Sequence, residues 1–544
     1  SSDSPVVAVV RMGLLPLLLL SLVSLSHGYK IAIFASDITS SQNIWNRRIA
    51  DTLSSAGHEV VVYVISSYKT KPAKIEFVSG VKAEYVNASV PHDIHELMKE
   101  ANDITFYDVP FYDSRQKARA KIFTAMGESC EPLITNSTFL DSVRSEKFDL
   151  AFTHMYTYCN IGVIYQTGIP TWIWLNSAPM AEHIGQSIGL PMPPSYCSHM
   201  MQDAGEDMGF VDRLKSFFAH LLTVPMVRMG SSSTETAFFR KHFGEHFPDL
   251  FELGKQAPLV MVNTVELYDF ARPTLAKIVN IGGIGINVTA GKELTGEFAR
   301  LVDSSDGFIV MTFGSIAPMH LMPKEWKKSI AISFSRFPHL QFFIRYEKEE
   351  DEFTRSLPKN THVSKWLPQG DLLGHPKCRG LITHAGYNSL QDVFHSGIPT
   401  ITVPLFGDQP KNARLAEKLG VGIRVTKNQM MTAIALSSAI DKLTRDKSLS
   451  DNAKKLRRQI ELRPVSSSDL LIKWTEFLAE FKTLDNLVPF GVHLNSFVYH
   501  SLDVISFVLF SSLFIIFLIY RICYKCYRCF KLFLPEDEIK LKNE

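Results

Sequence analysis

The chain has 544 residues, a formal net charge of +2 at pH 7, and 46% hydrophobic residues. This length exceeds what a single packed core usually supports, so we expect two domains with additional segments. Acidic and basic residues are mixed along the chain without a dense basic stripe, which argues against a nucleic-acid-binding protein.

An apolar segment comes first, over residues 12–28. Its run of leucines is too short to span a membrane, Arg11 precedes it, and the small residues Ser26 and Gly28 lie at its end. This pattern is typical of a secretory signal peptide, with cleavage expected near Ser26 to Gly28. A buried amino-terminal strand is the alternative interpretation.

Strands and helices alternate through the amino-terminal half. Lys30–Ser36 and Val60–Ile65 are predicted strands. Residues 43–55 between them have the spacing of an amphipathic helix, with Ile44, Ile49 and Leu53 on its inner face. Phe148–Phe152 and Thr171–Leu175 are predicted as later strands. This strand-helix-strand order predicts a Rossmann-like domain with a parallel sheet.

The carboxyl-terminal half predicts a second domain of the same α/β class. We expect the first domain over residues 29–275 and the second over residues 276–485. The second domain includes a helix near its end, residues 470–481, which we expect to pack back onto the protein before the chain reaches its last apolar segment.

Polar side chains of the second domain cluster where strands end. Leu381–Thr383 is a short apolar strand. His384 and Gly386 turn out of it, and Asn388 and Ser389 then open a helix. A helix amino terminus offers unpaired backbone N–H groups and the positive end of a dipole, so this arrangement predicts an anion site.

Further hydrogen-bonding side chains belong to the same region. Asp392 lies one helical turn after Asn388, and two more polar residues, Asp408 and Gln409, follow an apolar strand. Such groups can hold hydroxyls, while Trp366 offers a flat face for a ring. Each residue alone also fits a structural role in a core, a cap or a plain turn.

Four motifs within this region resemble a known family. They are W-L-P-Q, D-L-L-G-H-P-K, T-H-A-G-Y-N-S and P-L-F-G-D-Q, at residues 366–369, 371–377, 383–389 and 404–409. In this order and spacing they are similar to the signature of the UDP-glycosyltransferases in their animal, glucuronosyltransferase-type form, and the chain resembles a nematode-like member. The resemblance implies the GT-B fold, in which two Rossmann-like domains, one for the acceptor and one for the UDP-sugar, face each other.

The resemblance also implies a set of donor-binding residues in the carboxyl-terminal half. They are Gly314 and Ser315 near the phosphates or the sugar, Trp366 and Gln369 at uridine, His384, Gly386, Asn388 and Ser389 at the diphosphate, Asp392 at the ribose, and Asp408 and Gln409 at the donor sugar. The family usually has glutamate where this chain has Asp392. The UDP-sugar is a co-substrate, so we expect no cofactor, and we expect no metal because no Asp-x-Asp motif is placed to bridge one to the diphosphate.

Sugar transfer with inversion to a hydroxyl needs a base that takes the acceptor proton. In the family this base is a histidine after the first strand, and an acidic residue after a later strand orients it. Counting from Gly57 and from Phe148 without gaps, these two positions fall on Gln42 and His154. Both members of the catalytic pair are therefore substituted, and Gln42 has no titratable group.

Three interpretations of this substitution stay open. His154 could serve as the base, or the acceptor could be an amine or a thiol, which needs less help. The chain could instead bind the donor with little activity and modulate related membrane enzymes. The third is an error of register, although the neighbouring His27 and His58 are poorly placed substitutes.

We expect a UDP-glycosyltransferase that transfers glucuronate or glucose from a UDP-sugar to small lipophilic acceptors with inversion. The alternative is a donor-binding but weakly active or non-catalytic member that modulates related membrane enzymes. Arg345, Lys411 and Arg414 are candidate cations for the glucuronate carboxylate. Residues 106–112 and 191–196 supply aromatic side chains and prolines suited to an apolar acceptor pocket.

A second apolar segment, residues 502–521, is predicted to span a membrane. Basic residues follow it directly, so we expect a type I protein with a luminal body and a cytosolic tail over residues 522–544. Lys540 and Lys542 resemble the dilysine retrieval signal of the endoplasmic reticulum. We therefore expect this chain in the endoplasmic reticulum membrane, with copies of itself or related enzymes as candidate partners.

Residues that carry modifications agree with a luminal body. Asn87, Asn136 and Asn287 each begin an N-x-S/T sequon before the membrane segment, so we expect glycans there. The cysteines before that segment are Cys130, Cys159, Cys197 and Cys378. Their spacing does not decide whether or how they pair.

Overall fold

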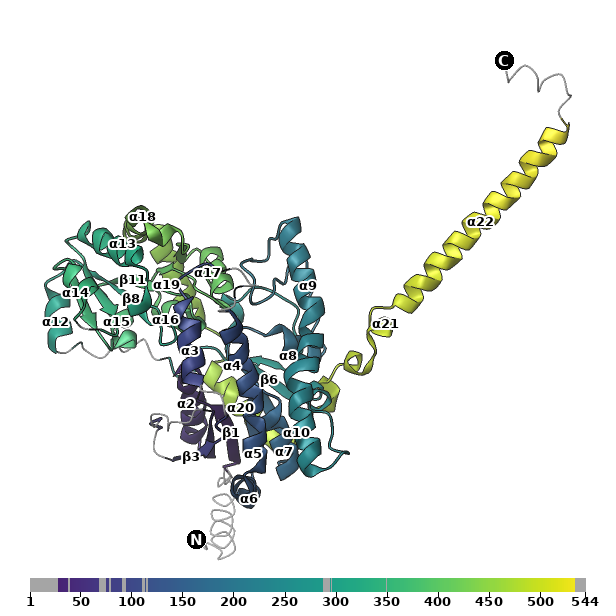
Figure 1. Cartoon of the computed structure of the whole chain (residues 1–544), viewed down its shortest axis with the longest axis horizontal. Coiled ribbons are helices and arrows are strands. Elements are labelled where there is room, and N and C mark those ends of the chain that lie inside the picture. Colours follow the sequence, from purple (N-terminus) through teal and green to yellow (C-terminus); the bar gives the residue numbers. More distant parts are fainter. Residues whose placement is uncertain are drawn as a thin grey trace, which may run out of the picture. The chain divides into compact units, whose positions relative to one another are not determined.

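Figure 1 shows the computed structural model of the chain. It describes residues 28–533, except for residues 38–39, 68–74, 78–79, 91–93, 110–112, 114–115, 287–293, 295 and 349. The chain divides into two compact units, the first ending at Val488 and the second beginning at Pro489. Residues 12–27 of the expected signal peptide and residues 534–544 of the expected tail lie outside the described residues.

A parallel sheet organises the amino-terminal half, with the described strands in the order β3-β2-β1-β4-β5-β6-β7. The strands are β1 (Lys30–Ser36), β2 (Glu59–Ser66), β3 (Val81–Asn87), β4 (Leu150–His154), β5 (Trp172–Asn176), β6 (Leu259–Val262) and β7 (Ile278–Asn280). Successive residues of β1 enter different cores, Ile31 and Ile33 on one face and Ala32 and Phe34 on the other. Both faces of the sheet are therefore buried, which explains its continuous apolar strands.

A second parallel sheet organises the carboxyl-terminal half, with the described strands in the order β10-β9-β8-β11-β12-β13. The strands are β8 (Phe308–Thr312), β9 (Gln341–Arg345), β10 (Thr361–Ser364), β11 (Cys378–Thr383), β12 (Thr400–Thr402) and β13 (Gly422–Arg424). Together the sheets confirm the expected α/β fold with two Rossmann-like domains.

Helices connect the strands of each sheet. In the amino-terminal half they are α2 (Ser40–Ser55), α3 (Ile94–Asp103), α4 (Gln116–Glu128), α5 (Cys130–Thr135), α6 (Ser137–Glu146), α7 (Cys159–Thr167), α8 (Glu182–Ser187), α9 (Phe210–Val227), α10 (Ser233–Phe243) and α11 (Leu250–Lys255). In the carboxyl-terminal half they are α12 (Gly296–Asp303), α13 (Lys324–Ser335), α14 (Glu352–Ser356), α15 (Gln369–Gly374), α16 (Tyr387–Ser396), α17 (Gln409–Lys418), α18 (Ala433–Arg445), α19 (Lys447–Glu461) and α20 (Ser467–Phe481).

The chain crosses between the two domains more than once. Strand β7 pairs with β6, so the first sheet extends beyond residue 275, where we expected the first domain to end. Helix α20 returns to the first domain, beside α2 in Figure 1, and buries Leu471 and Leu478 in the core of the first sheet. The expected return helix therefore packs on the amino-terminal domain.

Phe106, in the segment between α3 and α4, binds the two domains together. Its ring lies 6.1 Å from that of Phe313 and 5.5 Å from that of Trp326, inside the core of the second sheet. We expected residues 106–112 to line an acceptor pocket. For Phe106 this expectation is wrong, because the side chain is buried in the other domain.

A disulfide bond joins Cys130, at the start of α5, to Cys159, at the start of α7, with 5.6 Å between the Cα atoms. It decides a pairing that the sequence left open. Cys197 and Cys378 are buried free thiols. The bond fixes two helices of the first core at their amino-terminal ends, and both cysteines belong to that core.

The second unit contains the short helix α21 (Ser496–Tyr499) and the long helix α22 (Leu502–Phe533). Within the described residues, α22 is the one helix long and apolar enough to cross a membrane, over Leu502–Lys531 with a mean hydropathy of 2.6. The helix includes the expected span, residues 502–521, and continues through the first part of the expected tail.

Candidate functional site

The strand ends of the second sheet create the first half of the site. Thr383 of β11 is in register with Thr312 of β8 on one side and with Thr402 of β12 on the other. The loops that leave these strands therefore begin side by side. They carry most of the predicted donor-binding residues. We call the full predicted set the donor corner: Gly314, Ser315, Trp366, Gln369, His384, Gly386, Asn388, Ser389, Asp392, Asp408 and Gln409.

His384 lies between two glycines at the centre of the donor corner. A Cβ atom at Gly314 would lie 2.8 Å from His384 Cε1, and one at Gly386 would lie 2.5 Å from His384 Nε2. Gly314 also has a φ of 71°, and Ala385 in the same turn has a φ of 65°. Positive φ values strain non-glycine residues, so this turn is a tightly specified feature of the kind found at binding sites.

The turn delivers the chain to the amino terminus of α16. Gly386 is the N-cap and has no side chain to occupy the first backbone N–H groups of the helix, which leaves them available to an anion. Burial lowers the pKa of His384 to about 4, so its imidazole is neutral at pH 7. A neutral imidazole and a helix amino terminus together can bind phosphate oxygens.

Asn388 and Ser389 occupy the first turn of α16. The Asn388 side chain accepts a hydrogen bond from Asn263 Nδ2 at 3.2 Å and donates one to the carbonyl of Ser41 at 3.1 Å. Asn388 therefore bridges the two domains in this structure, and its expected contact with the diphosphate stays a prediction. Ser389 is half-buried beside it.

Gln369 and Asp392 contact each other directly. Gln369 Nε2 donates to Asp392 Oδ2 at 2.8 Å. Burial raises the pKa of Asp392 to about 6, and the charge of Arg48 and the Gln369 hydrogen bond oppose that rise. Trp366, three residues before Gln369, is 74% exposed, so its ring is open to a stacking partner.

Asp408 and Gln409 begin α17, and internal contacts use part of their hydrogen-bonding capacity. Gln409 Oε1 accepts the backbone N–H groups of Leu405 and Phe406 at 2.9 and 3.2 Å, so its Nε2 is the group left for a ligand. Asp408 accepts from Asn412 Nδ2 at 2.7 Å, and burial raises the pKa of Asp408.

The three candidate cations make protein contacts. Arg345 donates to the carbonyl of Gly314, and Lys411 donates to the carbonyl of Ser198. Arg414 forms an ion pair with Asp203 at 3.1 Å. Arg345 thus supports the Gly314 turn of the donor corner, while Lys411 and Arg414 join the second domain to the first.

The second half of the site lies on the first domain, where we define the acid–base corner as Gln42, Asn46, His154 and Tyr156. Gln42 and Asn46 are one turn apart on α2 and lie on one face of it, and His154 is the last residue of β4. His154 is 2% exposed, and its Nε2 hydrogen-bonds to Asn46 Oδ1. Trp45 packs edge-on against the His154 ring at 5.7 Å.

Burial dominates the chemistry of His154 and lowers its pKa to about 4. Its Nδ1 is buried and has no hydrogen-bond partner among the described residues. Since Asn46 Oδ1 is an acceptor, Nε2 carries the proton, and Nδ1 holds the free lone pair. His154 also lines a cavity of about 30 Å³, together with Ser36, Ile65 and Met126.

Tyr156 links the two corners. Its hydroxyl lies 2.7 Å from Ser177 Oγ and is hydrogen-bonded to Gln42. Burial and the nearby Asp408 carboxylate raise the pKa of Tyr156, so the hydroxyl stays protonated at neutral pH. Because Ser41 also accepts a hydrogen bond from Asn388, the start of α2 meets the donor corner directly.

Sequence reasoning missed Asn46 and Tyr156. Asn46 follows Gln42 by four residues on a predicted helix, and this spacing could have flagged it. Tyr156 lies two residues beyond the end of β4, where no periodic pattern points to it. An amide and a phenol have no catalytic signature of their own, however, and only the contacts select them.

The expected sequons have different surroundings. Asn87 ends β3 and is exposed, while Asn136 caps α6 and accepts a hydrogen bond from the N–H of Phe139 at 3.1 Å. Asn287 lies outside the described residues. Among the residues that the structure describes, no group of three or more His, Cys, Asp or Glu could hold a metal ion.

The chain is similar to glycosyltransferases over most of its length. It is 29% identical over 506 residues to "Putative UDP-glucuronosyltransferase ugt-46" of Caenorhabditis elegans, covering 91% of this chain and 93% of that protein. It is also 29% identical to UDP-glucuronosyltransferase 1A7 of Mus musculus over 482 residues, covering 85% of each chain.

Solved structures show the same fold at low sequence identity. Spinosyn forosaminyltransferase SpnP has a TM-score of 0.55 at 17% identity, covering 84% of this chain and 100% of that chain. LpCGTa, solved in complex with UDP, has a TM-score of 0.52 at 15% identity with the same coverage. The expected GT-B fold is therefore confirmed. The family model described as "UDP-glucoronosyl and UDP-glucosyl transferase" matches residues 30–533, and the chain belongs to this family.

Proposed function

We propose that this chain is a UDP-sugar-dependent transferase that moves glucuronate or glucose to small lipophilic acceptors with inversion. The observation that carries the proposal is the placement of His384 between Gly314 and Gly386 at the amino terminus of α16. Two glycines that make room for one imidazole beside unpaired N–H groups suit a diphosphate better than a structural turn.

The donor corner has groups for each part of a UDP-sugar. Trp366 can stack on uracil, and the Asp392 carboxylate can accept from ribose hydroxyls. The backbone N–H groups of α16 and neutral His384 can stabilise the charge that develops on UDP as it leaves. Asp408 and the free Nε2 of Gln409 can orient the transferred sugar.

The acid–base corner supplies a base. With its proton on Nε2 and directed to Asn46, His154 can accept a proton at Nδ1. The acceptor oxygen then forms its bond to the anomeric carbon, the bond from that carbon to UDP breaks on the opposite face, and the acceptor proton passes to Nδ1. A pKa of about 4 makes His154 a weak base, which favours acceptors that are nucleophilic without much help.

The acceptor side is narrow and has a mixed lining. The cavity beside His154 has a volume of about 30 Å³, room for a water molecule, and both apolar side chains, such as Ile65 and Met126, and polar ones, such as Ser129 and Asn160, line it. An acceptor therefore has to widen it by moving these side chains. The apolar part of the lining supports a lipophilic acceptor, because a polar group placed there would lose its hydration without compensation.

One experiment tests the donor site and the transfer reaction separately. The purified full-length protein should bind UDP in calorimetry, and should convert UDP-glucuronate or UDP-glucose when offered phenols, amines and thiols. Nuclear magnetic resonance of the product should show the inverted anomer. Failure to bind UDP would overturn the donor site, and binding without turnover of any acceptor would replace the transferase proposal by the second candidate.

The second candidate is a donor-binding member with little activity that modulates related membrane enzymes. It is favoured by the loss of a titratable group at Gln42 and by the low pKa of His154. It predicts that this chain binds UDP as tightly as an active relative does. It also predicts that reconstituting the chain together with that relative changes the relative's turnover.

We also propose that α22 anchors the protein in the endoplasmic reticulum membrane with its body in the lumen. The length and hydropathy of α22 and the sequons at Asn87 and Asn136 support this topology. Intact microsomes should protect the body from added protease, and endoglycosidase H should shift its mobility. A body that is degraded in intact microsomes would contradict the proposed orientation.

A further inference from the structure

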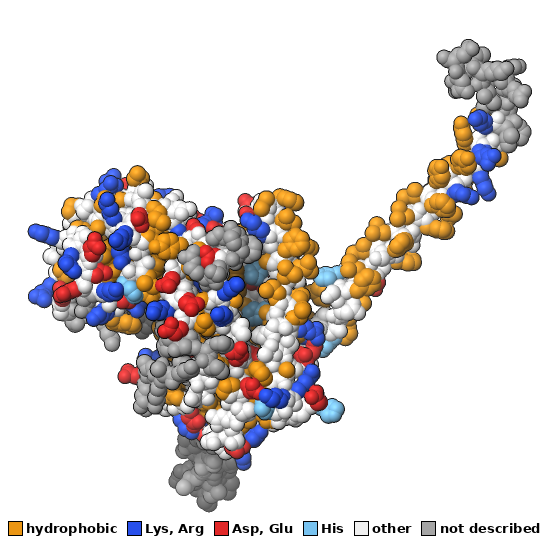
Figure 2. Space-filling view, in the orientation of Figure 1, with side chains coloured by type: hydrophobic (Ala, Val, Ile, Leu, Met, Phe, Trp, Pro, Cys, Tyr) orange, Lys and Arg blue, Asp and Glu red, His pale blue; other side chains and the backbone are white. Residues whose placement is uncertain are grey.

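Helix α9 exposes an unusually apolar face. Figure 2 shows hydrophobic side chains gathered along this helix. Phe210 is 70% exposed and Met226 is 69% exposed, and the remaining large apolar residues of the exposed face are Val211, Leu214, Phe217, Phe218, Leu221 and Leu222. Their spacing of three and four residues places them on one side of the helix, and Lys215 at the edge is the charged member of that side. We call these eight apolar residues the α9 face.

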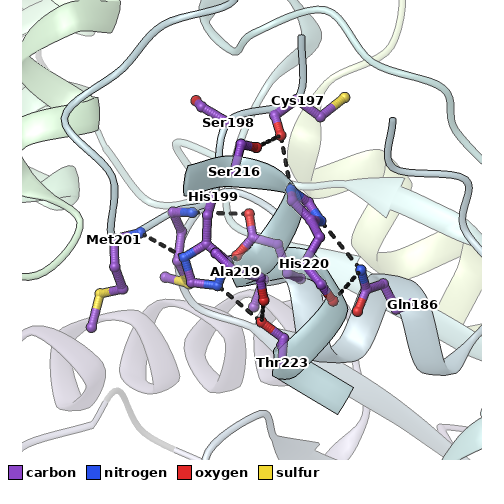
Figure 3. A network of polar contacts seen from close by, with 12 residues as sticks. Gln186, Cys197, Ser198, His199, Met201, Ser216, Ala219, His220 and Thr223 are labelled. Carbon is purple, nitrogen blue, oxygen red and sulfur yellow. Dashed lines mark hydrogen bonds and ion pairs between the residues drawn. The ribbon is translucent and has the colours of Figure 1, made fainter. Parts of the chain in front are cut away.

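The most deeply buried residues on the opposite side of α9 are polar. A surface helix usually buries its apolar side and exposes its polar side, so α9 has the reverse arrangement. Ser216 is fully buried and His220 nearly so. His220 Nε2 lies 2.8 Å from the carbonyl of Cys197, and its Nδ1 lies 3.2 Å from Gln186 of α8. Thr223 lies 3.1 Å from His199 Nε2 (Figure 3).

This network settles which way α9 faces. Each inward polar group has a partner that a rotated helix would lose, and an unpaired buried polar group costs free energy. Val224 and Val227 pack on the first core from the same inward side. The α9 face is therefore held outward by its own buried contacts and cannot be covered by turning the helix.

We propose that the α9 face docks on the surface of a lipid bilayer, so that the body lies on the membrane in which α22 anchors the chain. This inference rests on the proposed anchoring by α22. A helix with aromatic and leucine residues on one side and few charges there inserts into the boundary between headgroups and acyl chains.

The length of chain before α22 brings the body within reach of that surface. Residues 489–501 separate the first unit from α22, and fully extended they span at most about 45 Å. Such a tether keeps the body at a high effective concentration near the bilayer, so even a weak affinity of the α9 face is sufficient for docking. The bilayer is therefore the apolar surface that the α9 face meets most often.

The test uses the full chain with a protease site inserted between Pro489 and Ser501. The protein is reconstituted in phosphatidylcholine vesicles, the site is cut, and the vesicles are floated. We expect the released body to stay with the vesicles. In a variant with Phe210→Gln, Phe218→Gln and Met226→Gln, we expect its partition coefficient to fall about 100-fold. A single change at the centre of the α9 face, Leu221→Glu, should lower it as well.

A matched variant changes three exposed apolar residues on other helices, Ile332→Gln, Ile434→Gln and Phe477→Gln, and should leave retention unchanged. Retained UDP binding shows that each variant is folded. Loss of the uncut chain from the vesicles would refute the anchoring by α22 and leave the transferase proposal intact. Release of the cut wild-type body overturns the docking proposal, as does a wild-type body that dimerises in solution through the α9 face and does not float.

Discussion

The donor corner and the acid–base corner are built in different ways. The donor corner comes from strand ends that are adjacent in one sheet, and its specificity resides in a backbone turn, Gly314, Gly386 and the start of α16. The acid–base corner comes from a contact between Asn46 and His154, which are 108 residues apart. A site made by a local turn can be recognised as a short sequence motif, whereas a site made by one long-range contact leaves no local pattern in the sequence.

The largest expected effect tests whether the acid–base corner is catalytic at all. His154→Ala should lower turnover by about 10² to 10⁴-fold, since it removes the free lone pair that accepts the proton. The affinity for UDP, measured by calorimetry, should stay the same because the donor corner is untouched. Such a split between turnover and binding separates the two corners.

A second buried histidine serves as the control for this variant. His58 lies just before β2, at the other end of the strand from the site, and accepts a hydrogen bond from the N–H of Tyr29 at 3.2 Å. His58→Ala should lower thermal stability without a specific loss of turnover. If both variants lost activity equally, His154 would be a structural residue.

The next effect tests the backbone turn of the donor corner. Gly314→Val should weaken UDP binding about 100-fold, because its Cβ would push the His384 ring and a branched residue disfavours a φ of 71°. Gly370→Val is the matched control, since a Cβ there meets no atom within 4 Å and its φ is not positive. Unchanged UDP affinity in Gly314→Val would mean that the ligand does not approach this turn.

The difference between local patterns and long-range contacts also explains how much of the molecule the sequence could predict. The alternation of apolar strands and helices predicted both sheets, and the glycine-bearing sequence predicted the turn at the start of α16, where we propose that the diphosphate binds. Both are local patterns with a direct physical cause. The packing of α20 back onto the protein was expected as well, because its apolar spacing requires a partner. That this partner is the first domain, and not the second domain to which we assigned the helix, came only from the structure.

Contacts between distant segments could not be predicted. Phe106 entered the second core although its own segment belongs to the first domain, and Asn388 turned to Ser41 and Asn263. Ile44 is another case. We expected it on the inner face of the helix over residues 43–55, but the structure exposes Ile44 and buries its neighbour Trp45. Burial of these side chains is decided by elements that lie far away in the sequence.

A smaller effect is expected at Trp366. Its ring is 74% exposed, so Trp366→Ala should leave the free energy of unfolding nearly unchanged. It should weaken UDP binding about tenfold, in line with the loss of one stacking contact on a base. Phe481→Ala, another exposed aromatic residue, is the control and should not change UDP affinity. An intact affinity in Trp366→Ala would remove this residue from the uridine site.

The smallest change in rate is expected for Asn46→Asp, and this variant tests most directly whether His154 is the base. A carboxylate at this position would face the Nε2–H of His154 and favour the imidazolium, so the pKa of His154 should rise from about 4. The base is active when deprotonated, so wild-type turnover at saturating UDP-sugar, where protonation of Asp392 near pH 6 does not limit donor binding, should fall as the pH drops through about 4. In the variant this acidic limb should move up by about one unit or more.

Turnover of the variant at pH 7 should rise about threefold, because a stronger base removes the acceptor proton more readily. Asn46→Leu is the control, since it removes the hydrogen bond that fixes the tautomer without adding charge, and its turnover should fall. If the acidic limb stayed in place in Asn46→Asp while UDP binding was unchanged, another group would be the base. Tyr156, which is hydrogen-bonded to Gln42 and close to Asp408, would then be the residue to test.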